Sequence, residues 1–172
     1  MNQEYILRDS CADDATTIVS WFANEQEALN WGGPLTSFPV TAAWLAEEFL
    51  DPLRSYYTLI DAEGEVTGTY FLYHMPDENR LHIGRFAVSP AWRRRGLATR
   101  MIELAKQNAR AIGVSALTLN VYEHNGGARK LYEGAGFYVP ADAVIESDRG
   151  GRVIPMRFDI SNRDGANNSI AS

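Results

Sequence analysis

The chain has 172 residues, of which 45% are hydrophobic and 22% are charged, a composition typical of one soluble globular domain with its own core. Its formal net charge of −6 argues against a nucleic-acid partner, because binding to phosphate backbones depends on clustered cations. Cys11 is the single cysteine, which excludes an internal disulfide and a thiolate metal cluster. No apolar leader follows Met1 and no run approaches the roughly twenty apolar residues of a membrane span, so we expect a cytoplasmic protein without membrane contact.

The first half of the chain alternates between strand and helix patterns. Asp9, Ser10 and Asp13 can cap an early helix, and Thr41 can cap a later one. The glycines and proline near residue 33 indicate a break between these helices. The expected elements are a strand over residues 5–8, a helix that ends near residue 23, a break at 30–34, a short helix over 42–50, and a hairpin of strands 55–60 and 65–73 with its turn at 61–64.

The stretch from residue 81 to 113 combines a strand with a helix. Residues 81–88 are mostly apolar and end before Pro90, which cannot extend a ladder. From Gly96 onward the period changes, and Gly113 is a plausible stop. One face of the predicted helix carries Leu97, Met101, Leu104, Ala105, Asn108 and Ile112.

Between this strand and this helix lie three consecutive arginines, Arg93, Arg94 and Arg95. A helix start exposes about four unpaired N–H groups and a partial positive charge, so guanidinium groups there are unfavourable unless an anion binds. Gly96 and Ala98 are small enough to let a phosphate approach the backbone. A Walker loop would need Gly-Lys-Ser/Thr here, and the dinucleotide motif would need three spaced glycines. The loop is therefore a phosphate cradle of another type, or a basic solvated loop.

The second half continues with a strand, a short helix and two further strands. The alternation over residues 116–121 predicts a strand, and Asn125 and Gly136 are positioned to cap and stop the helix that follows. Two last strands are expected near residues 139–145 and 152–160, joined through 147–151. The polar residues 161–172 resemble a disordered tail.

Two motifs in this order identify a family resemblance. The first is Arg93-x-x-Gly96-x-Ala98, and the second is Asn125-x-x-Ala128-x-x-Leu131-Tyr132-x-x-x-Gly136-Phe137. Both resemble the signatures of the GCN5-related N-acetyltransferases (GNAT). The resemblance is specific over residues 81–137 and only topological elsewhere. It implies a single α+β domain over residues 1–160, with a central mixed, mostly antiparallel sheet flanked by helices. It also implies transfer of an acetyl group from acetyl-CoA to a primary amine, without a metal.

The resemblance also implies where acetyl-CoA binds. In the family, the loop amides hold the pyrophosphate, strand backbone groups pair with the pantetheine amides, and the asparagine contacts the pantetheine. The cofactor-binding residues implied in this way are Phe86, Ala87, Val88, Arg93, Arg94, Arg95, Gly96, Leu97, Ala98, Thr99 and Asn125.

The catalytic residues implied are Tyr132 and His82. In the family, the tyrosine that matches Tyr132 lies near the cofactor sulfur and can act as a general acid; packing in the core is the alternative. Some relatives carry a base at the position of Asn120, which cannot take a proton. His82 matches a strand position that orients water in some relatives, and an imidazole with a pKa near 6.5 would suit a base. Glu123 and His124 remain alternatives.

The acceptor is left open by the sequence. Four aromatic residues flank the break near residue 33 and could form a substrate wall or ordinary core: Trp21, Phe22, Trp31 and Phe38. A small molecule or a protein N-terminus could provide the amine. A catalytically idle acyl-CoA sensor and an interaction domain with the same fold are the alternative functions. The C-terminal strands could pair between subunits, which would give a homodimer.

Overall fold

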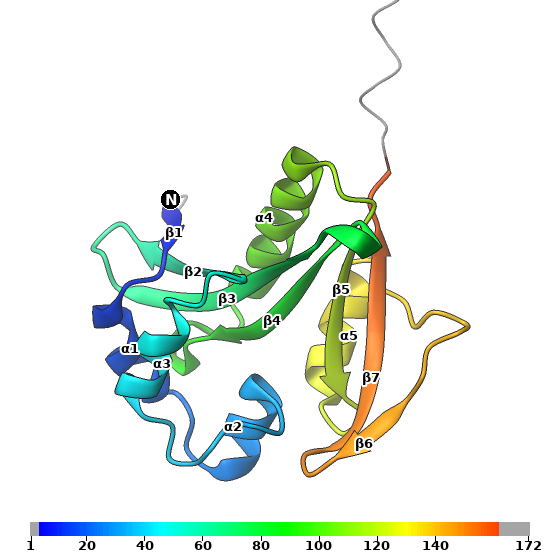
Figure 1. Cartoon of the computed structure of the whole chain (residues 1–172). Helices are drawn as coiled ribbons and strands as arrows, with labels where there is room; N and C mark the ends of the chain where they lie inside the picture. The colour runs from blue at the N-terminus through cyan, green and yellow to red at the C-terminus, as the bar shows by residue number, and fades with distance from the viewer. Residues whose placement is uncertain (1–3, 162–172) are drawn as a thin grey trace, which may run out of the picture.

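The computed structural model describes residues 4–161, which form one seven-stranded sheet with helices against it (Figure 1). The strands lie in the order β1-β2-β3-β4-β5-β7-β6, and every neighbouring pair is antiparallel except β4 and β5. The elements in chain order are β1 (Tyr5–Asp9), α1 (Ala12–Val19), α2 (Glu25–Gly32), α3 (Ala42–Glu48), β2 (Arg54–Asp61), β3 (Val66–Met75), β4 (Arg80–Val88), α4 (Leu97–Ile112), β5 (Ala116–Tyr122), α5 (Gly126–Gly134), β6 (Glu146–Asp148) and β7 (Gly151–Asp159). The predicted mixed, mostly antiparallel α+β sheet is confirmed.

Two buried clusters pack against the two faces of the sheet. The larger cluster joins α4 and α5 to strand residues such as Leu59, Tyr70 and Leu119. The smaller cluster joins α1, α2 and α3, with Ile18 and Leu45 fully buried. Strand side chains alternate between faces, so β3 can supply both layers. Figure 1 shows α4 on one side of the strands and α1 and α3 on the other.

The central strands β4 and β5 pair along only part of their length. Their parallel register runs from Arg80 opposite Ala116 to Ile83 opposite Leu119, and then the strands separate. Just beyond this point β4 has an irregularity in its pairing with β3, and Arg85 has the positive φ of 47°. A bulge of this kind bends the strand and re-aims its side chains. The separation leaves the middle of the sheet open, where a continuous β4–β5 ladder would close it.

The helix predicted after the arginine loop is confirmed. Helix α4 begins after Gly96, at φ 77°, and ends at Gly113, at φ 87°. Both values lie in the left-handed region, where glycine avoids the clash of a Cβ atom. The short helix after Thr41 is also confirmed, since the Thr41 hydroxyl accepts a hydrogen bond from the Trp44 amide at 3.3 Å. None of the helices within residues 4–161 is long and apolar enough to cross a membrane.

Three predictions about elements need correction or fall outside the described residues. The first helix ends at Val19, and the expected break at 30–34 overlaps a further helix, α2, whose last residue is Gly32. Residues 139–145 form no strand; the penultimate strand is β6, and Tyr138 makes only an isolated bridge to Arg157. The predicted tail, apart from its first residue, lies outside the described part of the chain.

Candidate active site

A groove of about 480 Å³ opens where β4 and β5 separate; we call it the strand groove. Its walls come from the end of β4, the starts of α4 and α5, α2, and Phe22 in the segment before α2. The lining residues are Phe22, Glu27, Asn30, Trp31, Phe86, Ala87, Val88, Arg93, Ala98, Asn125, Gly127, Ala128, Leu131 and Tyr132.

The start of α4 presents unpaired donors and cations together. In residues 4–161 the N–H groups of Leu97, Ala98 and Thr99 have no hydrogen-bond acceptor, and Gly96 provides no side-chain cap. The three arginines before Gly96 are exposed and form no ion pair within the same residues. Free N–H groups and uncompensated cations make a favourable site for an anion.

Seven of the sequence-predicted residues line the strand groove: Phe86, Ala87, Val88, Arg93, Ala98, Asn125 and Tyr132. Arg94, Gly96 and Thr99 lie exposed in or beside the α4 start, and the guanidinium of Arg95 lies over the Trp92 ring at 4.6 Å. Leu97 is 3% exposed and belongs to the larger core. Asn125 occupies the first position before α5, but its side chain makes no capping hydrogen bond, so the expected side-chain cap is wrong.

Tyr132 lies in α5 against the inner wall of the strand groove. Its ring meets Phe86 edge-on at 6.0 Å and Phe137 at the same distance, which fixes its orientation. The residue is 7% exposed, and burial raises the pKa of its hydroxyl well above the usual value. Tyr132 is therefore a protonated hydroxyl in a largely apolar wall, and it both packs in the core and faces the groove.

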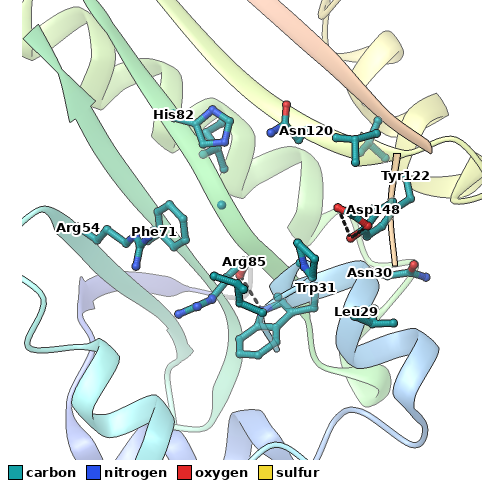
Figure 2. Close-up of a pocket in the computed structure, with 18 residues that line it drawn as sticks. Leu29, Asn30, Trp31, Arg54, Phe71, His82, Arg85, Asn120, Tyr122 and Asp148 are labelled. Atoms are coloured by element: carbon teal, nitrogen blue, oxygen red, sulfur yellow. Dashed lines mark hydrogen bonds between the residues drawn. The ribbon is translucent and has the colours of Figure 1, made fainter. Parts of the chain in front are cut away.

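A second cavity of about 300 Å³ lies next to the groove and is covered by α2; we call it the α2 pocket (Figure 2). Asn30 and Trp31 line both cavities, so the two spaces meet at the end of α2. The polar and charged residues that line the α2 pocket are Asn30, Arg54, His82, Arg85, Asn120, Tyr122 and Asp148. The apolar and small lining residues are Leu29, Trp31, Gly32, Gly33, Pro34, Leu35, Phe71, Ile83, Gly84, Val121 and Val153.

His82 lies on β4 in the wall of the α2 pocket and does not line the strand groove. Its Nδ1 is 3.0 Å from the Thr118 hydroxyl, which also accepts a hydrogen bond from Arg80. Burial, and then the nearby positive charges of Arg80 and Arg54, lower the pKa of His82 to about 4. The pKa is lower than the expected value near 6.5, because the ring is partly buried and lies near guanidinium groups. His82 is neutral at pH 7 and can accept a proton there only as a weak base.

The two alternative bases lie outside the cavity linings. The Glu123 carboxylate is exposed and pairs with Arg152 at 3.1 Å. His124 reaches the Asn30 side chain with its Nε2 at 2.8 Å, and its ring stacks on Tyr122. His124 therefore contacts Asn30 and Tyr122, which line the cavities, whereas Glu123 lines neither cavity.

Arg85 organises the floor of the α2 pocket and was not expected from the sequence. Its guanidinium donates to Glu48 at 2.5 Å and also bonds the Tyr56 hydroxyl, and it lies 4.6 Å from the Trp44 ring centre. Its backbone carbonyl accepts a hydrogen bond from the indole N–H of Trp31 at 2.9 Å. Arg85 thus ties the β4 bulge to both α2 and α3.

The flanking aromatic residues divide between core and wall. Trp21 is 7% exposed in the smaller core, whereas Phe38 is 41% exposed. Phe22 stacks on Trp31 at 4.5 Å, and both line the strand groove.

Arg54, Phe71 and Asp148 also reach the α2 pocket from distant segments, and no local motif marks them. Within residues 4–161, no group of three or more His, Cys, Asp and Glu side chains is arranged to hold a metal ion.

Comparison with known proteins gives matches that are all described as acetyltransferases. The profile of the Acetyltransferase (GNAT) family matches residues 18–137. An uncharacterized N-acetyltransferase, YycN, of Bacillus subtilis (strain 168) is 32% identical over 88 residues, which is 50% of this chain and 56% of that protein. The chain thus spans about half the length of the curated relatives it matches.

Solved structures match over nearly the whole chain. A spermidine N-acetyltransferase from Vibrio cholerae, in complex with CoA and spermine, has a TM-score of 0.71 at 20% identity and covers 90% of this chain and 95% of its own. The ribosomal-protein-S18-alanine N-acetyltransferase from Escherichia coli has a TM-score of 0.66 at 19% identity and covers 98% and 100%. At these identities the likeness establishes a shared fold.

Proposed function

This chain belongs to the Acetyltransferase (GNAT) family, and from that premise we propose that it transfers an acetyl group from acetyl-CoA directly to a primary amine. The observation that carries the proposal is the meeting of two cavities at Asn30 and Trp31. One cavity ends at the unpaired N–H groups and arginines of the α4 start, which suit a phosphate-bearing donor. The other is a separate polar pocket of a size that suits a small acceptor.

The strand groove offers a partner to each part of acetyl-CoA in turn. The pyrophosphate would lie on the N–H groups of residues 97–99 with Arg93 beside it. The pantetheine arm would extend along Phe86 to Val88, where β4 has lost β5 as a neighbour and its backbone groups can pair with amides of the arm. The thioester would then reach Tyr132 and the junction with the α2 pocket.

The chemistry needs a neutral amine and a stabilised leaving group. The amine nitrogen attacks the thioester carbon, the new C–N bond forms, and the C–S bond breaks. The ammonium group loses two protons on the way to the amide: the sulfur takes one, and the other leaves to solvent. An alkyl ammonium group has a pKa of about 10.4, so removal of its first proton is part of the barrier. No covalent acyl-enzyme is required.

Tyr132 and His82 divide these tasks. Because burial raises the pKa of Tyr132, its hydroxyl is a weaker acid than a thiol, whose pKa is about 8.5. Tyr132 would therefore keep its own proton and stabilise the developing thiolate by donating a hydrogen bond, and the thiolate takes the proton that the amine releases. His82 is neutral at pH 7 and would orient a water that carries the amine proton away.

The acceptor class follows from the pocket and from the relatives. The two structural neighbours named above act, by their names, on spermidine and on an alanine of ribosomal protein S18, and both names describe acetylation at nitrogen. The α2 pocket of this chain is covered by α2 and Arg149 of the β6–β7 turn, whose guanidinium donates to the Pro34 and Thr36 carbonyls. This cover favours a small molecule over an extended peptide.

The proposal is tested by measuring thiol release from acetyl-CoA against a panel of small amines and peptide N-termini. We expect release with at least one small amine, together with a mass gain of one acetyl group on that amine. Calorimetric titration with CoA is run in parallel. Binding of CoA without transfer to any acceptor would overturn the proposed activity and favour a cofactor sensor. Absence of CoA binding would remove the assignment of the strand groove.

A further inference from the structure

We propose that the acceptor carries, besides the amine that is acetylated, a second amine that stays protonated at neutral pH, and that Asp148 binds this ammonium group. The inference rests on the proposed function and specifies its substrate class. It follows from the charges around the α2 pocket, from the partners of Asp148 and from the position of Asp148 relative to His82.

The cations in the wall of the α2 pocket are already neutralised. Arg54 pairs with Asp51 at 3.1 Å and with Glu48 at 3.4 Å. Arg85 pairs with the same Glu48 at 2.5 Å. His82 adds no charge at pH 7, because its pKa is lowered to about 4. Two guanidinium groups thus face two carboxylates, and this part of the wall has no net charge to offer an anionic acceptor.

Asp148 is the remaining charge in the wall, and its partners are neutral. It accepts hydrogen bonds from the Tyr122 hydroxyl at 2.9 and 3.1 Å and from the Gly150 amide at 2.7 Å. Within residues 4–161 no lysine, arginine or histidine nitrogen lies within ion-pair distance of it. Its neighbour Arg149 instead pairs with Glu25 at 3.0 Å. The wall therefore has one uncompensated negative charge.

The carboxylate is held in place but has room for one more donor. Burial, and then the hydrogen bond to Asp148, raise the pKa of Tyr122 to about 12, so the hydroxyl keeps its proton and keeps donating. A carboxylate offers about four acceptor positions, and the Tyr122 hydroxyl, whose one proton is shared between the two oxygens, and the Gly150 amide occupy three at most. An ammonium group can take the fourth. Leu29, Val121 and Val153 line the same pocket and suit the methylene chain between two amines.

The group at Asp148 is distinct from the reacting amine. Figure 2 shows His82 and Asp148 on opposite sides of the pocket, so an amine that loses its proton near His82 cannot also be held by Asp148. A lone carboxylate also favours the charged form of a bound ammonium group and would slow the attack of that nitrogen. Asp148 therefore suits a group that stays charged, and the acceptor is an aliphatic diamine or a longer amine of the same kind.

The test compares two acceptors of matched length, 1,4-diaminobutane and n-butylamine, in the wild type and in three variants. Asp148→Asn removes the charge but can still accept from Tyr122, and Glu146→Gln removes a charge from the same strand at an exposed position outside the pocket. We expect the wild type to prefer the diamine. Asp148→Asn should lower the ratio of kcat/KM for diamine to monoamine at least tenfold, mainly through KM, while Glu146→Gln and Asp148→Glu keep it.

Each other outcome decides against one claim. A wild type that acetylates both amines without preferring the diamine overturns the inference and leaves the proposed function intact. Equal losses for both amines in Asp148→Asn, with unchanged CoA affinity and melting temperature, would place Asp148 at the reacting amine and also overturn it. A wild type that binds CoA but acetylates neither these amines nor any in the panel would refute the proposed function itself.

Discussion

Gly96 provides the sharpest test of the phosphate site, because the same helix offers a matched control. Gly96 and Gly113 flank α4 at φ 77° and 87°, and a Cβ atom at either position would meet no heavy atom within 4 Å. Replacing either glycine with Trp imposes the same left-handed strain, about 1–2 kcal/mol. For a chain of this size we expect a fall in melting temperature of roughly 2–8 °C in both variants.

Only the Gly96→Trp side chain would occupy the space in front of the N–H groups of residues 97–99. A hydrogen bond to a charged group contributes about 1.5–3 kcal/mol, so loss of one such bond weakens binding roughly 10- to 150-fold. We expect at least this loss in calorimetric titration with CoA for Gly96→Trp and little change for Gly113→Trp. Unchanged affinity in folded Gly96→Trp, or an equal loss in Gly113→Trp, would refute the phosphate site.

Three further substitutions test the chemistry and the framework. Tyr132→Phe keeps the packed ring and should lower turnover about 100- to 10,000-fold with little change in CoA affinity, measured with chemistry rate-limiting; full turnover would make the hydroxyl structural. The pKa of His82 is about 4 when folded and near 6.5 when unfolded, so the unfolded chain binds more protons between these values and stability falls as pH drops through them. The fall in melting temperature from pH 7 to pH 4.5 should therefore shrink in His82→Gln, and an unchanged fall would contradict the buried ring. Arg85→Met removes the guanidinium that bonds both Glu48 and Tyr56 and should cost about 1–3 kcal/mol in chemical denaturation, and a neutral result would show that the cluster does not hold the bulge.

Some errors of the sequence-based prediction have identifiable causes. Helix α2 ends at Gly32 and is followed by Gly33 and Pro34, and such a run of glycines and proline indicates a break when only the local sequence is considered. The helix is held by distant partners, since Trp31 bonds the Arg85 carbonyl and Arg149 bonds the carbonyls that follow α2. The run at 139–145 has strand-like residues, but Pro140 lacks an N–H donor, and β7 is already paired with β5 and β6.

The sequence by itself determined the local structure of the region for which we propose phosphate binding. A strand that ends at a proline, three arginines, a glycine at a helix start and a helix of regular period are local features, and α4 forms where they predict it. The second motif likewise located α5, with Tyr132 in the wall of the strand groove. These properties depend on residues that are close in the chain, so their physical chemistry can be derived without the fold.

Only the tertiary structure decided the acceptor side. The α2 pocket combines α2, β2, β3, β4, β5 and the β6–β7 hairpin, and no spacing in the sequence indicates that Asp148 and His82 share one cavity. The pKa of His82 depends on burial and on guanidinium groups from β2 and β4, so the pKa of a free imidazole did not predict it. The charge of the pocket wall is also a sum over ion pairs that form only on folding. Substrate choice is therefore a property of the folded chain, because it depends on which charges remain unpaired once the strands are assembled.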